Sequence, residues 1–575
     1  MQIIRSRKTY DVVIVGSGAG GGMAAKVLTE AGADVLMLEA GPMWDPVKDS
    51  KMFEWNYESP RRGASIPSRQ FGEFDAALGG FTLEGEPYTT AQGQQFLWFR
   101  SRMLGGRTNH WGRISLRWGP DDFRPKSVDG LGDDWPIGYD DLRPFYDEVD
   151  KLVGVYGTNL GPRFPNEPDG LFLPPPQPRC YELLIRDASA RLNVPCVPAR
   201  LSILTKPLNG RPACHYCGQC NRGCATGSNF QSTTVLIPPA MKTGRLTLIA
   251  DAMAREVTVD DGGLADGVTY IDKKTGRDNH ARGRIVVLAA SSCETARLLL
   301  NSKSGKFPQG LANSSGAVGR YLTDSTGAGV SGFIPRLMSN IPHNEDGVGG
   351  MHLFMPWWLD NKKLDFPRGY HIEIGGGRRM PGAGFLGNIH SFTGVDASGT
   401  PIAFGGYGTQ LKDDYRRVYG SVVSFSGRGE MIPNDNCYCE IDPRQVDQYG
   451  IPVLLFHWKW SDYEKLQAKH MQETFRAIIH EMGGTPLSQM PSEERRYGLA
   501  QGGEIIHELG TTRMGNDPST SVLNSQCQAH DVKNLFVADG GPFVTQANKN
   551  CTWTILALSM RTSQYIADQR RGGTI

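Results

Sequence analysis

Uninterrupted runs of apolar residues recur along the chain, and a segment with helical spacing follows each of them. The first run, Val12 to Val15, is rich in β-branched residues. Comparable combinations occur at residues 284–302 and at residues 534–568, where a Gly-Pro loop separates the strand from the helix. A continuous apolar run is typical of a strand that is buried on both faces. The pattern therefore predicts an α/β fold in which helices cover a parallel sheet.

The first apolar run leads into a glycine-rich turn. Gly16, Gly18 and Gly21 have the spacing G-x-G-x-x-G. In such a turn the first glycine permits the tight bend, the second lets the backbone approach a pyrophosphate, and the third lets helix and strand pack closely. The next strand ends in Glu39, at the position where an acid holds the adenosine ribose hydroxyls. This context predicts a dinucleotide site and does not separate NAD from FAD; a purely structural glycine turn is the alternative.

Composition and charge narrow the class of protein. A chain of 575 residues is long enough for two or three interleaved domains. Its 61 Lys and Arg residues nearly balance 60 Asp and Glu residues, which gives no support to a nucleic-acid or anionic-membrane partner. No apolar stretch reaches about 18 residues, so we expect no membrane-spanning helix. The N-terminal residues lack signal-peptide features and predict a cytoplasmic protein, or a periplasmic one if it is exported together with a partner subunit.

Four further segments carry a resemblance that spans the chain. They are LGGRTNHWGR at residues 104–113, RIVVLAASSCETARLLLNS at 284–302, HELGTTRMG at 507–515 and NLFVADGGPFVTQANKNCTWTILALSMRTSQYIAD at 534–568. Together with the N-terminal turn, and in this order, they resemble the glucose-methanol-choline (GMC) family of FAD oxidoreductases. The likeness is strongest to the sugar-oxidising branch, which includes pyranose oxidases and bacterial FAD-dependent glucoside 3-dehydrogenase subunits.

The resemblance implies where FAD is held. In that family the N-terminal turn binds the ADP half, the Gly-Gly segment lies along the flavin, and the last strand-loop-helix covers the pyrophosphate. The residues implied to contact FAD are Gly16, Gly18, Gly21, Glu39, Gly105, Gly106, Asn109, His110, Ala289, Asp539 and Gly540. In pyranose oxidases a histidine after the Gly-Gly pair is bonded covalently to the flavin. His110 is similar in position, so the resemblance leaves a covalent link open.

The resemblance also implies a catalytic pair. Relatives carry a histidine six residues before the Arg of an R-M-G segment, and His507 has that position relative to Arg513. Their partner is an Asn or His at the start of the last helix, where Asn550 aligns and Asn548 is the alternative. Neutral imidazole suits removal of a hydroxyl proton, and an amide can both donate to and accept from that hydroxyl. Cys551 stands where many relatives have proline, which leaves the local backbone open.

Four cysteines are crowded into the stretch CHYCGQCNRGC. Cys214, Cys217, Cys220 and Cys224 have the spacing C-x2-C-x2-C-x3-C of bacterial ferredoxins. Ala225 replaces the proline that usually follows the fourth cysteine. The spacing predicts a four-iron (4Fe-4S) or three-iron (3Fe-4S) cluster, which some sugar dehydrogenases of the resembling family carry in their FAD subunit. A structural zinc site and two disulfides are the alternatives.

These features predict an FAD-dependent dehydrogenase that oxidises a secondary hydroxyl of a sugar or glycoside, for instance at C3 to give a 3-keto-glycoside. Electrons would leave through the iron–sulfur cluster to an external acceptor such as cytochrome c or a quinone, with a small accessory subunit as a further expected partner. An oxidase that forms hydrogen peroxide, with structural cysteines, is the main alternative. A non-redox lyase on the same fold and a subunit without its own activity are the others. The sequence does not identify the sugar.

The order of the motifs predicts the domains. Residues 1–120, 225–325 and 495–575 are expected to form a discontinuous Rossmann-type FAD-binding domain. Residues 121–224 form a connecting segment that contains the cysteines, and residues 326–494 form an α+β substrate domain with an antiparallel sheet.

Two features are expected inside the substrate domain. The stretch CYCEIDPRQVDQYGIPVLLFHWKW at residues 437–460 predicts strands of the sheet that covers the substrate side of the flavin. Trp357 and Trp358 are adjacent aromatic residues, which stack on a sugar face or fill the core.

Overall fold

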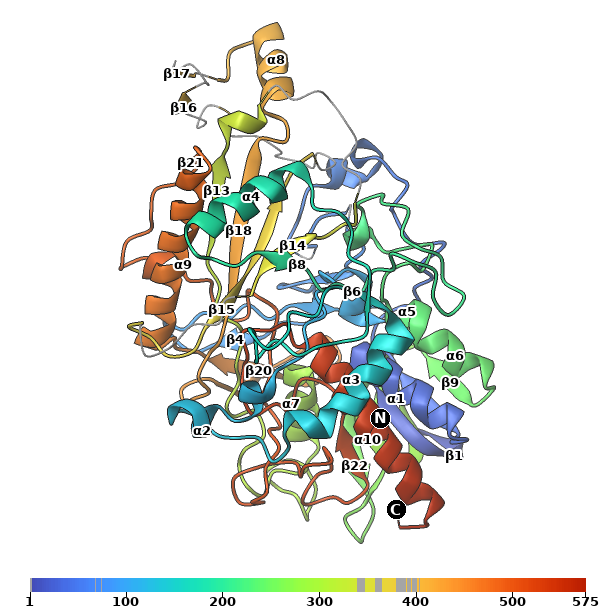
Figure 1. Ribbon diagram of the computed structural model, residues 1–575. Coiled ribbons are helices and arrows are strands. Elements are labelled where there is room, and N and C mark those ends of the chain that lie inside the picture. Colours follow the sequence, from blue (N-terminus) through green and yellow to red (C-terminus); the bar gives the residue numbers. More distant parts are fainter. Residues whose placement is uncertain are drawn as a thin grey trace.

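The computed structural model describes residues 3–67, 69–73, 75–338, 347–356, 364–378, 389, 394–395, 401–402 and 404–574. Trp357 and Trp358 lie outside the described residues. The larger of two main sheets occupies the lower part of Figure 1, where both chain ends also lie.

Seven strands form this larger sheet, in the order β10-β11-β12-β1-β2-β9 with β22 beside β12. They are β1 (Ile4–Val15), β2 (Val35–Leu38), β9 (Leu246–Ile249), β10 (Ala252–Val259), β11 (Ala265–Asp272), β12 (Arg277–Leu288) and β22 (Leu535–Val537). The strands β9, β2, β1, β12 and β22 pair in parallel, whereas β10 and β11 form antiparallel pairs. The parallel core is the Rossmann-type arrangement that the apolar runs predict.

Helices cover this sheet because its central strands are apolar on both faces. Val12, Val13 and Ile14 are fully buried in β1, which confirms the predicted buried strand. Helix α1 (Ala19–Glu30) lies beside the last helix, α10 (Thr552–Arg571), which also packs against α3 (Tyr139–Val153) (Figure 1). Helix α7 (Ser292–Asn301) packs on β10. The first and last parts of the chain therefore build one unit.

The second sheet has six strands in the order β21-β13-β18-β15-β14-β8, and its pairs are antiparallel. They are β8 (Val197–Pro198), β13 (Gly329–Phe333), β14 (Leu353–Met355), β15 (Tyr370–Gly376), β18 (Val422–Gly429) and β21 (Thr485–Pro486). Helix α9 (Asp462–Glu481) packs on one face of this sheet, in the upper part of Figure 1. The fold class is thus confirmed: a Rossmann-type sheet with an interleaved α+β part. The domain boundaries stay a prediction.

The stretch at residues 437–460 does not belong to the six-stranded sheet of the predicted substrate domain. It forms a hairpin of β19 (Tyr438–Val446) and β20 (Pro452–His457), which joins β4 (Thr89–Thr90) in a separate three-stranded sheet. The alternating pattern identifies strands correctly but carries no information about their partners, and here the third strand is only two residues long.

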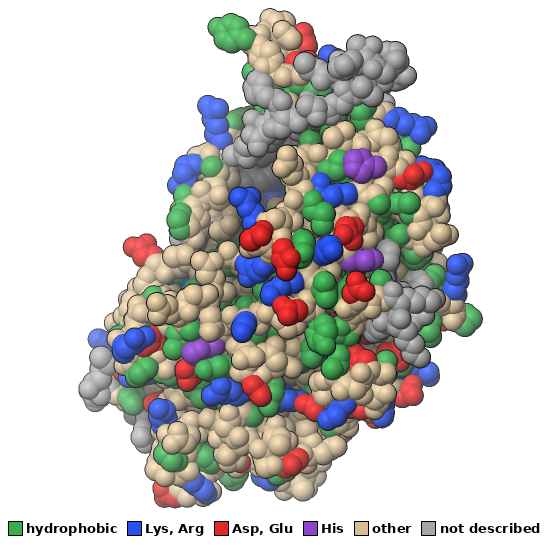
Figure 2. Space-filling view, turned by 90° about the vertical axis from the view of Figure 1, so that its left-hand side faces the viewer, with side chains coloured by type: hydrophobic (Ala, Val, Ile, Leu, Met, Phe, Trp, Pro, Cys, Tyr) green, Lys and Arg blue, Asp and Glu red, His purple; other side chains and the backbone are tan. Residues whose placement is uncertain are grey.

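Short elements complete the fold. The remaining helices are α2 (Pro125–Asp129), α4 (Cys180–Arg191), α5 (Ser232–Val235), α6 (Ile237–Lys242) and α8 (Thr409–Val418), and the remaining strands are β3 (Gly79–Gly80), β5 (Arg100–Ser101), β6 (Val155–Tyr156), β7 (Phe172–Leu173), β16 (Gly394–Val395) and β17 (Pro401–Ile402). Among the described residues, no helix combines the length and apolarity needed to cross a bilayer. Basic and acidic side chains are intermingled on the face in Figure 2.

The buried carboxylate of Asp150 in α3 binds both an arginine and the last helix. Asp150 accepts hydrogen bonds from Arg117 and from the indole Nε1 of Trp553 at 2.8 Å. The side chains of Asp150 and Arg117 are only 1% and 2% exposed. Arg117 also pairs with the partly exposed carboxylate of Asp147 at 2.7 Å, so Asp150 is the buried one of its two partners.

We predict that Asp150→Ala lowers the free energy of unfolding by about 1–3 kcal/mol, because the buried Trp553 indole loses its acceptor and Arg117 keeps only its pair with the partly exposed Asp147. Lys151→Ala is the matched control, since its ion pair with Glu148 is exposed to solvent and contributes little to stability. Thermal and urea unfolding of both variants measure the difference. Equal midpoints for the two variants would contradict the prediction.

Candidate active site

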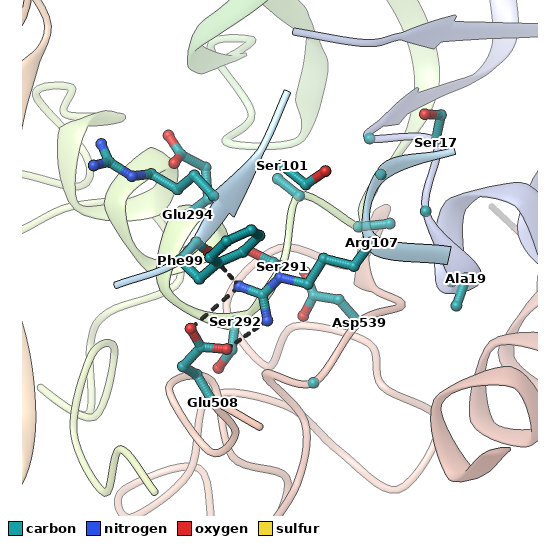
Figure 3. A pocket seen from close by; sticks show the side chains of 18 of the residues that line it. Ser17, Ala19, Phe99, Ser101, Arg107, Ser291, Ser292, Glu294, Glu508 and Asp539 are labelled. Atoms are coloured by element: carbon teal, nitrogen blue, oxygen red, sulfur yellow. Dashed lines mark hydrogen bonds and ion pairs between the residues drawn. The ribbon is translucent and has the colours of Figure 1, made fainter. Parts of the chain in front are cut away.

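A cavity of about 400 Å³ lies at the carboxyl ends of β1, β2 and β12. Parallel α/β sheets bind ligands in this place, outside the ends of the strands. The cavity extends from Glu39, after β2, to His507 and Asn550. Figure 3 shows part of its wall, where Ser291, Ser292 and Asp539 lie near Arg107. Of the residues implied to contact FAD, the lining includes Gly16, Gly18, Glu39, Gly106, His110, Ala289, Asp539 and Gly540.

The three motif glycines have different surroundings. Gly16 has φ of +99°, and a Cβ on it would lie 2.3 Å from the carbonyl oxygen of Ala289. A Cβ on Gly21 would lie 2.0 Å from the carbonyl oxygen of Gly16. A Cβ on Gly18 would meet no protein atom within 4 Å. Gly16 and Gly21 therefore allow close backbone packing, while Gly18 opens into the cavity at the start of α1, where free N–H groups favour an anion.

The Glu39 carboxylate is buried at the end of β2. It accepts hydrogen bonds from the backbone N–H groups of Ser17 at 3.2 Å and Gly41 at 2.8 Å, and from the Ser17 hydroxyl. Burial raises the pKa of Glu39. Ser17 was not predicted, although its hydroxyl also accepts from the backbone N–H of Gly105 at 2.8 Å. Ser17 thereby joins the glycine turn to the Gly-Gly segment.

The Gly-Gly segment forms another part of the wall. Gly21, Gly105 and Asn109 are not among the lining residues, and Asn109 is buried with its amide bonded to Leu104 O at 2.7 Å. Asn109 therefore supports the backbone of the cavity wall without lining the cavity itself. His110 does line the cavity, and its Nε2 lies 3.1 Å from the Ser101 hydroxyl. Burial, together with nearby guanidinium groups, lowers the pKa of His110 to about 3.

Asp539 lies two residues after the end of β22 and lines the cavity. It accepts hydrogen bonds from the Thr295 hydroxyl at 2.5 Å and from the backbone N–H of Gly541 at 2.8 Å. Burial raises the pKa of Asp539 to about 6. Two neighbouring residues that the sequence did not point out, Ser291 and Ser292 at the start of α7, also line the cavity.

An ion pair across the cavity wall was also missed. The Arg107 guanidinium contacts the Glu508 carboxylate at 2.6 and 3.2 Å, as Figure 3 shows, and it donates to Ile506 O at 3.2 Å. Both residues belong to sequence motifs given above, but the sequence does not indicate that they form a pair. Because Ile506 and Glu508 flank His507, this pair fixes the segment that carries the histidine.

His507 is held from behind by two residues of a remote loop. Its Nδ1 lies 2.9 Å from the Ser325 hydroxyl, and its backbone N–H donates to Asp324 Oδ1 at 2.9 Å. Gln546 also donates to the Ser325 hydroxyl, at 3.0 Å. Burial, together with Arg428, lowers the pKa of His507 to about 3. The imidazole is therefore neutral at physiological pH, as a proton acceptor must be.

The structure distinguishes between the two asparagines. Asn550 Nδ2 lies 3.4 Å from His507 Nε2, and both residues line the cavity. Asn548 bonds instead to Lys549 Nζ at 3.0 Å through its side chain. Asn550 Oδ1 is buried and has no hydrogen-bond partner among the described residues. The pair thus presents one acceptor nitrogen and one free acceptor oxygen at the same end of the cavity.

The four clustered cysteines surround one small cavity of their own. Cys214, Cys217, Cys220 and Cys224 are free thiols. Burial raises the pKa of Cys214 to about 12, and it also raises that of Cys217. Within the described part of the chain, no three His, Cys, Asp or Glu side chains are arranged around a common metal position.

The cysteine cavity lies close to the larger one. Asn229 lines the cysteine cavity, and the carbonyl of the next residue, Phe230, accepts a hydrogen bond at 3.2 Å from the indole of Trp111. Trp111 lines the larger cavity. One peptide unit and one hydrogen bond therefore connect the two walls.

Known proteins resemble this chain over its whole length. Family models described as GMC oxidoreductase match residues 199–326 and 433–559. The chain is 30% identical to 2-methyl-1,2-propanediol dehydrogenase of Mycolicibacterium austroafricanum, covering 97% of this chain and 95% of that protein. It is 26% identical to the fructose dehydrogenase large subunit of Gluconobacter japonicus over 98% of each chain. Paromamine 6'-oxidase of Streptomyces fradiae is 28% identical, with 97% of this chain and 92% of that protein covered.

A solved structure agrees in fold. Pyridoxine 4-oxidase from Mesorbium loti has a TM-score of 0.62 and 17% identity, and the match covers 96% of this chain and 98% of that one. Fold, cavity and relatives together define an oxidoreductase that acts on CH–OH groups. The chain belongs to the GMC oxidoreductase family, whose members bind FAD.

We predict that Gly18→Ala and Gly21→Ala fail in different ways. The new methyl group of Gly18→Ala meets no protein atom, so the protein should keep its unfolding temperature and lose FAD. The methyl group of Gly21→Ala collides with the Gly16 carbonyl, so the unfolding temperature itself should fall. Flavin absorbance per protein and thermal unfolding of the FAD-depleted proteins measure the two effects. A Gly18→Ala protein with full flavin content would contradict the assignment of the cavity.

Proposed function

We propose that this chain is an FAD-dependent dehydrogenase that oxidises a secondary hydroxyl of a sugar or glycoside and passes the electrons to an external acceptor. The observation that carries the proposal is the His507–Asn550 pair at one end of the cavity. A partly buried, neutral imidazole beside an amide with an unpartnered oxygen suits an alcohol and has no evident use in a purely structural site.

The residues fit FAD in three places. The Gly18 side of the turn is open, so that a pyrophosphate can approach the N-terminus of α1. Glu39 and Asp539 provide buried acceptors for ribose and ribityl hydroxyls. Gly106 and His110 lie along the wall between these residues and His507. FAD, when bound there, supplies the acceptor for the hydride that leaves the substrate carbon.

The chain's own residues handle the proton. A substrate hydroxyl at His507 Nε2 gives its proton to this nitrogen, while Nδ1–H donates to the Ser325 hydroxyl. This tautomer agrees with donation from Asn550 Nδ2 to Nε2 at 3.4 Å. Asn550 orients the alcohol, and its 3.4 Å contact is long enough to be replaced by a substrate oxygen.

The relatives support the substrate class. Fructose dehydrogenase and paromamine 6'-oxidase act, by their names, on a sugar and on an aminoglycoside, and C-glycoside 3-oxidase of Microbacterium trichothecenolyticum is 26% identical over 97% of this chain. The third name supports oxidation at C3. The names of the relatives include both oxidases and dehydrogenases, so they do not decide between oxygen and another electron acceptor. The proposal of an external acceptor rests on the spacing of the four cysteines.

The cysteine spacing supports an iron–sulfur cluster as the electron exit. Cys214, Cys217, Cys220 and Cys224 line one cavity, and each cysteine of such a cluster binds a different iron, so the sulfurs need not converge on one ion. These thiolates would hold a cluster of three or four irons, which supplies one-electron transfer. An accessory subunit and a cytochrome c or quinone are the proposed partners, and the name of the fructose dehydrogenase large subunit supports a multi-subunit assembly.

We predict that His507→Ala lowers the rate of flavin reduction by a sugar by about 10²-fold or more, because the proton acceptor is lost. Asn550→Ala should lose less, since the amide only orients the hydroxyl. Because burial lowers the pKa of His507 to about 3, the parent rate should stay flat between about pH 5 and 8 and fall only as the pH approaches that pKa and the imidazole becomes protonated. Anaerobic stopped-flow absorbance at several pH values measures these rates.

His457→Ala is the matched control for His507→Ala. His457 lies in β20 and bonds to Glu440 at 2.9 Å, away from the cavity. In the His457→Ala protein, a sugar should reduce the flavin at the parent rate. A His507→Ala protein that holds FAD and is also reduced at the parent rate would rule out the proposed base.

We predict that Cys217→Ser and Cys220→Ser each lose iron and stop reducing cytochrome c, while sugar still reduces the flavin and a small dye still accepts its electrons. The reason is that a missing thiolate removes a cluster ligand but not a group of the catalytic pair. Iron and sulfide analysis, together with acceptor rates, measures the effect. Cys180→Ser is the control, since Cys180 is an exposed thiol outside the cluster.

The same experiment separates the alternatives. Unchanged cytochrome reduction in a folded Cys217→Ser protein would exclude the cysteines as the electron path. Stoichiometric zinc without iron in the parent protein would assign them to a structural site. Rapid hydrogen peroxide formation in air would favour the oxidase.

A further inference from the structure

The two faces of the six-stranded sheet differ in chemistry. On the face toward α9, the Tyr370 hydroxyl lies 2.8 Å from His470 Nδ1, and Phe425 stacks on Phe475 with ring centroids 5.8 Å apart. This face is a packing surface. Since side chains alternate along a strand, the neighbouring positions of β15 and β18 point to the opposite face.

The opposite face carries charged and polar side chains. In the register of β15 and β18, His371 pairs with Arg428 and Glu373 pairs with Ser426. Arg428 contacts Glu373 Oε2 at 3.3 Å and donates to the Ser426 hydroxyl at 2.6 Å. The side chains of Glu373 and Arg428 keep 16% and 21% of their surface exposed. Both side chains are therefore partly exposed, although neither is among the residues that line the cavity of about 400 Å³.

Glu373 lies directly beside the catalytic pair. Its Oε1 accepts a hydrogen bond from Asn550 Nδ2 at 3.4 Å and lies 3.3 Å from His371 Nε2. The same Asn550 nitrogen lies 3.4 Å from His507 Nε2. A hydroxyl at His507 is thus separated from the Glu373 carboxylate by a single amide group. All contacts of Glu373 named here are long, and substrate hydroxyls can replace such bonds.

We propose that Glu373 is a specificity-determining residue that accepts a hydrogen bond from the hydroxyl on the carbon next to the one that is oxidised. The enzyme then selects vicinal diols, as in a sugar ring, over isolated alcohols. This inference rests on the proposed oxidation of sugar hydroxyls.

The charge arrangement supports this role. Burial alone would raise the pKa of Glu373, but Arg428 and His371 lower it to about 2, so the carboxylate stays ionised. An ionised carboxylate is an acceptor with about four sites, and Asn550 and Arg428 use two of them within the described residues. A neutral hydroxyl can use a remaining site, since it donates a hydrogen bond to the carboxylate without bringing a charge into the cavity. Adjacent ring hydroxyls place one such donor beside the reacting oxygen.

The test compares substrates with and without the neighbouring hydroxyl. Flavin reduction in the holoenzyme is followed with methyl β-D-glucopyranoside and its 2-deoxy and 4-deoxy analogues, and with trans-1,2-cyclohexanediol and cyclohexanol. The parent enzyme should prefer the diol of a matched pair by about 10- to 100-fold in kcat/KM, the contribution of one hydrogen bond to a charged group. Glu373→Gln should reduce the preference for the diol about tenfold, mainly through KM. Glu373→Asp should reduce this preference also, because its shorter side chain holds the carboxylate farther from the substrate.

The ratio between matched substrates separates recognition from a structural role, because a disturbed sheet lowers the rates of both substrates together. Glu440→Gln is the control, since Glu440 also bonds a histidine on a strand, at 2.9 Å, but lies in the remote hairpin. An unchanged preference in Glu373→Gln, or a parent enzyme that treats diol and alcohol alike, would overturn the inference while the proposed function stands. A parent enzyme whose flavin is reduced by no substrate of the panel contradicts the proposed function, and the inference falls with it.

Discussion

Close backbone packing at the first turn is the constraint on which the rest of the structure depends. The space beside Gly16 is filled by the carbonyl of Ala289, and the space beside Gly21 is filled by the carbonyl of Gly16. Strand β1, helix α1 and the end of β12 therefore meet without intervening side chains. This contact fixes where the carboxyl ends of the strands lie, and with them Glu39 at one end of the cavity. A side chain larger than hydrogen would separate the three elements.

The site at the other end depends on a different kind of contact. His507 belongs to a loop without regular secondary structure, so its position has to be imposed by neighbours. The Arg107–Glu508 ion pair holds the flanking residues, while Asp324 and Ser325 hold the backbone and ring of the histidine. Two separate parts of the chain, around Arg107 and around Asp324 and Ser325, thus hold the segment and ring of one histidine, which is the preorganisation that a proton acceptor needs.

Much of the fold was predictable from local patterns. The buried run Val12–Val15 and the glycine spacing identify β1 and the dinucleotide turn, because both depend on neighbouring residues only. The hairpin at residues 437–460 was recognised as strands but placed in the wrong sheet, since alternation does not encode the partner strand.

The site residues divide in the same way. The resemblance led to His507 and Asn550, and the structure brings them within 3.4 Å. Ser325 and Glu373 gave no signal, because they are ordinary polar residues that a remote loop and the strand β15 bring to the pair. Such residues become visible only when the sheets are assembled.

The wide separation of the contributing segments along the chain has a consequence for biosynthesis. Gly18 and Asn550 line the same cavity although 532 positions separate them. At ribosomal rates of about 5–20 residues per second, the dinucleotide turn emerges roughly half a minute to two minutes before Asn550 is added. During this interval the cofactor cavity lacks one end, and its apolar walls are exposed to solvent. A complete cofactor cavity therefore forms only late in synthesis, and FAD that binds there adds to the stability of the folded chain by mass action.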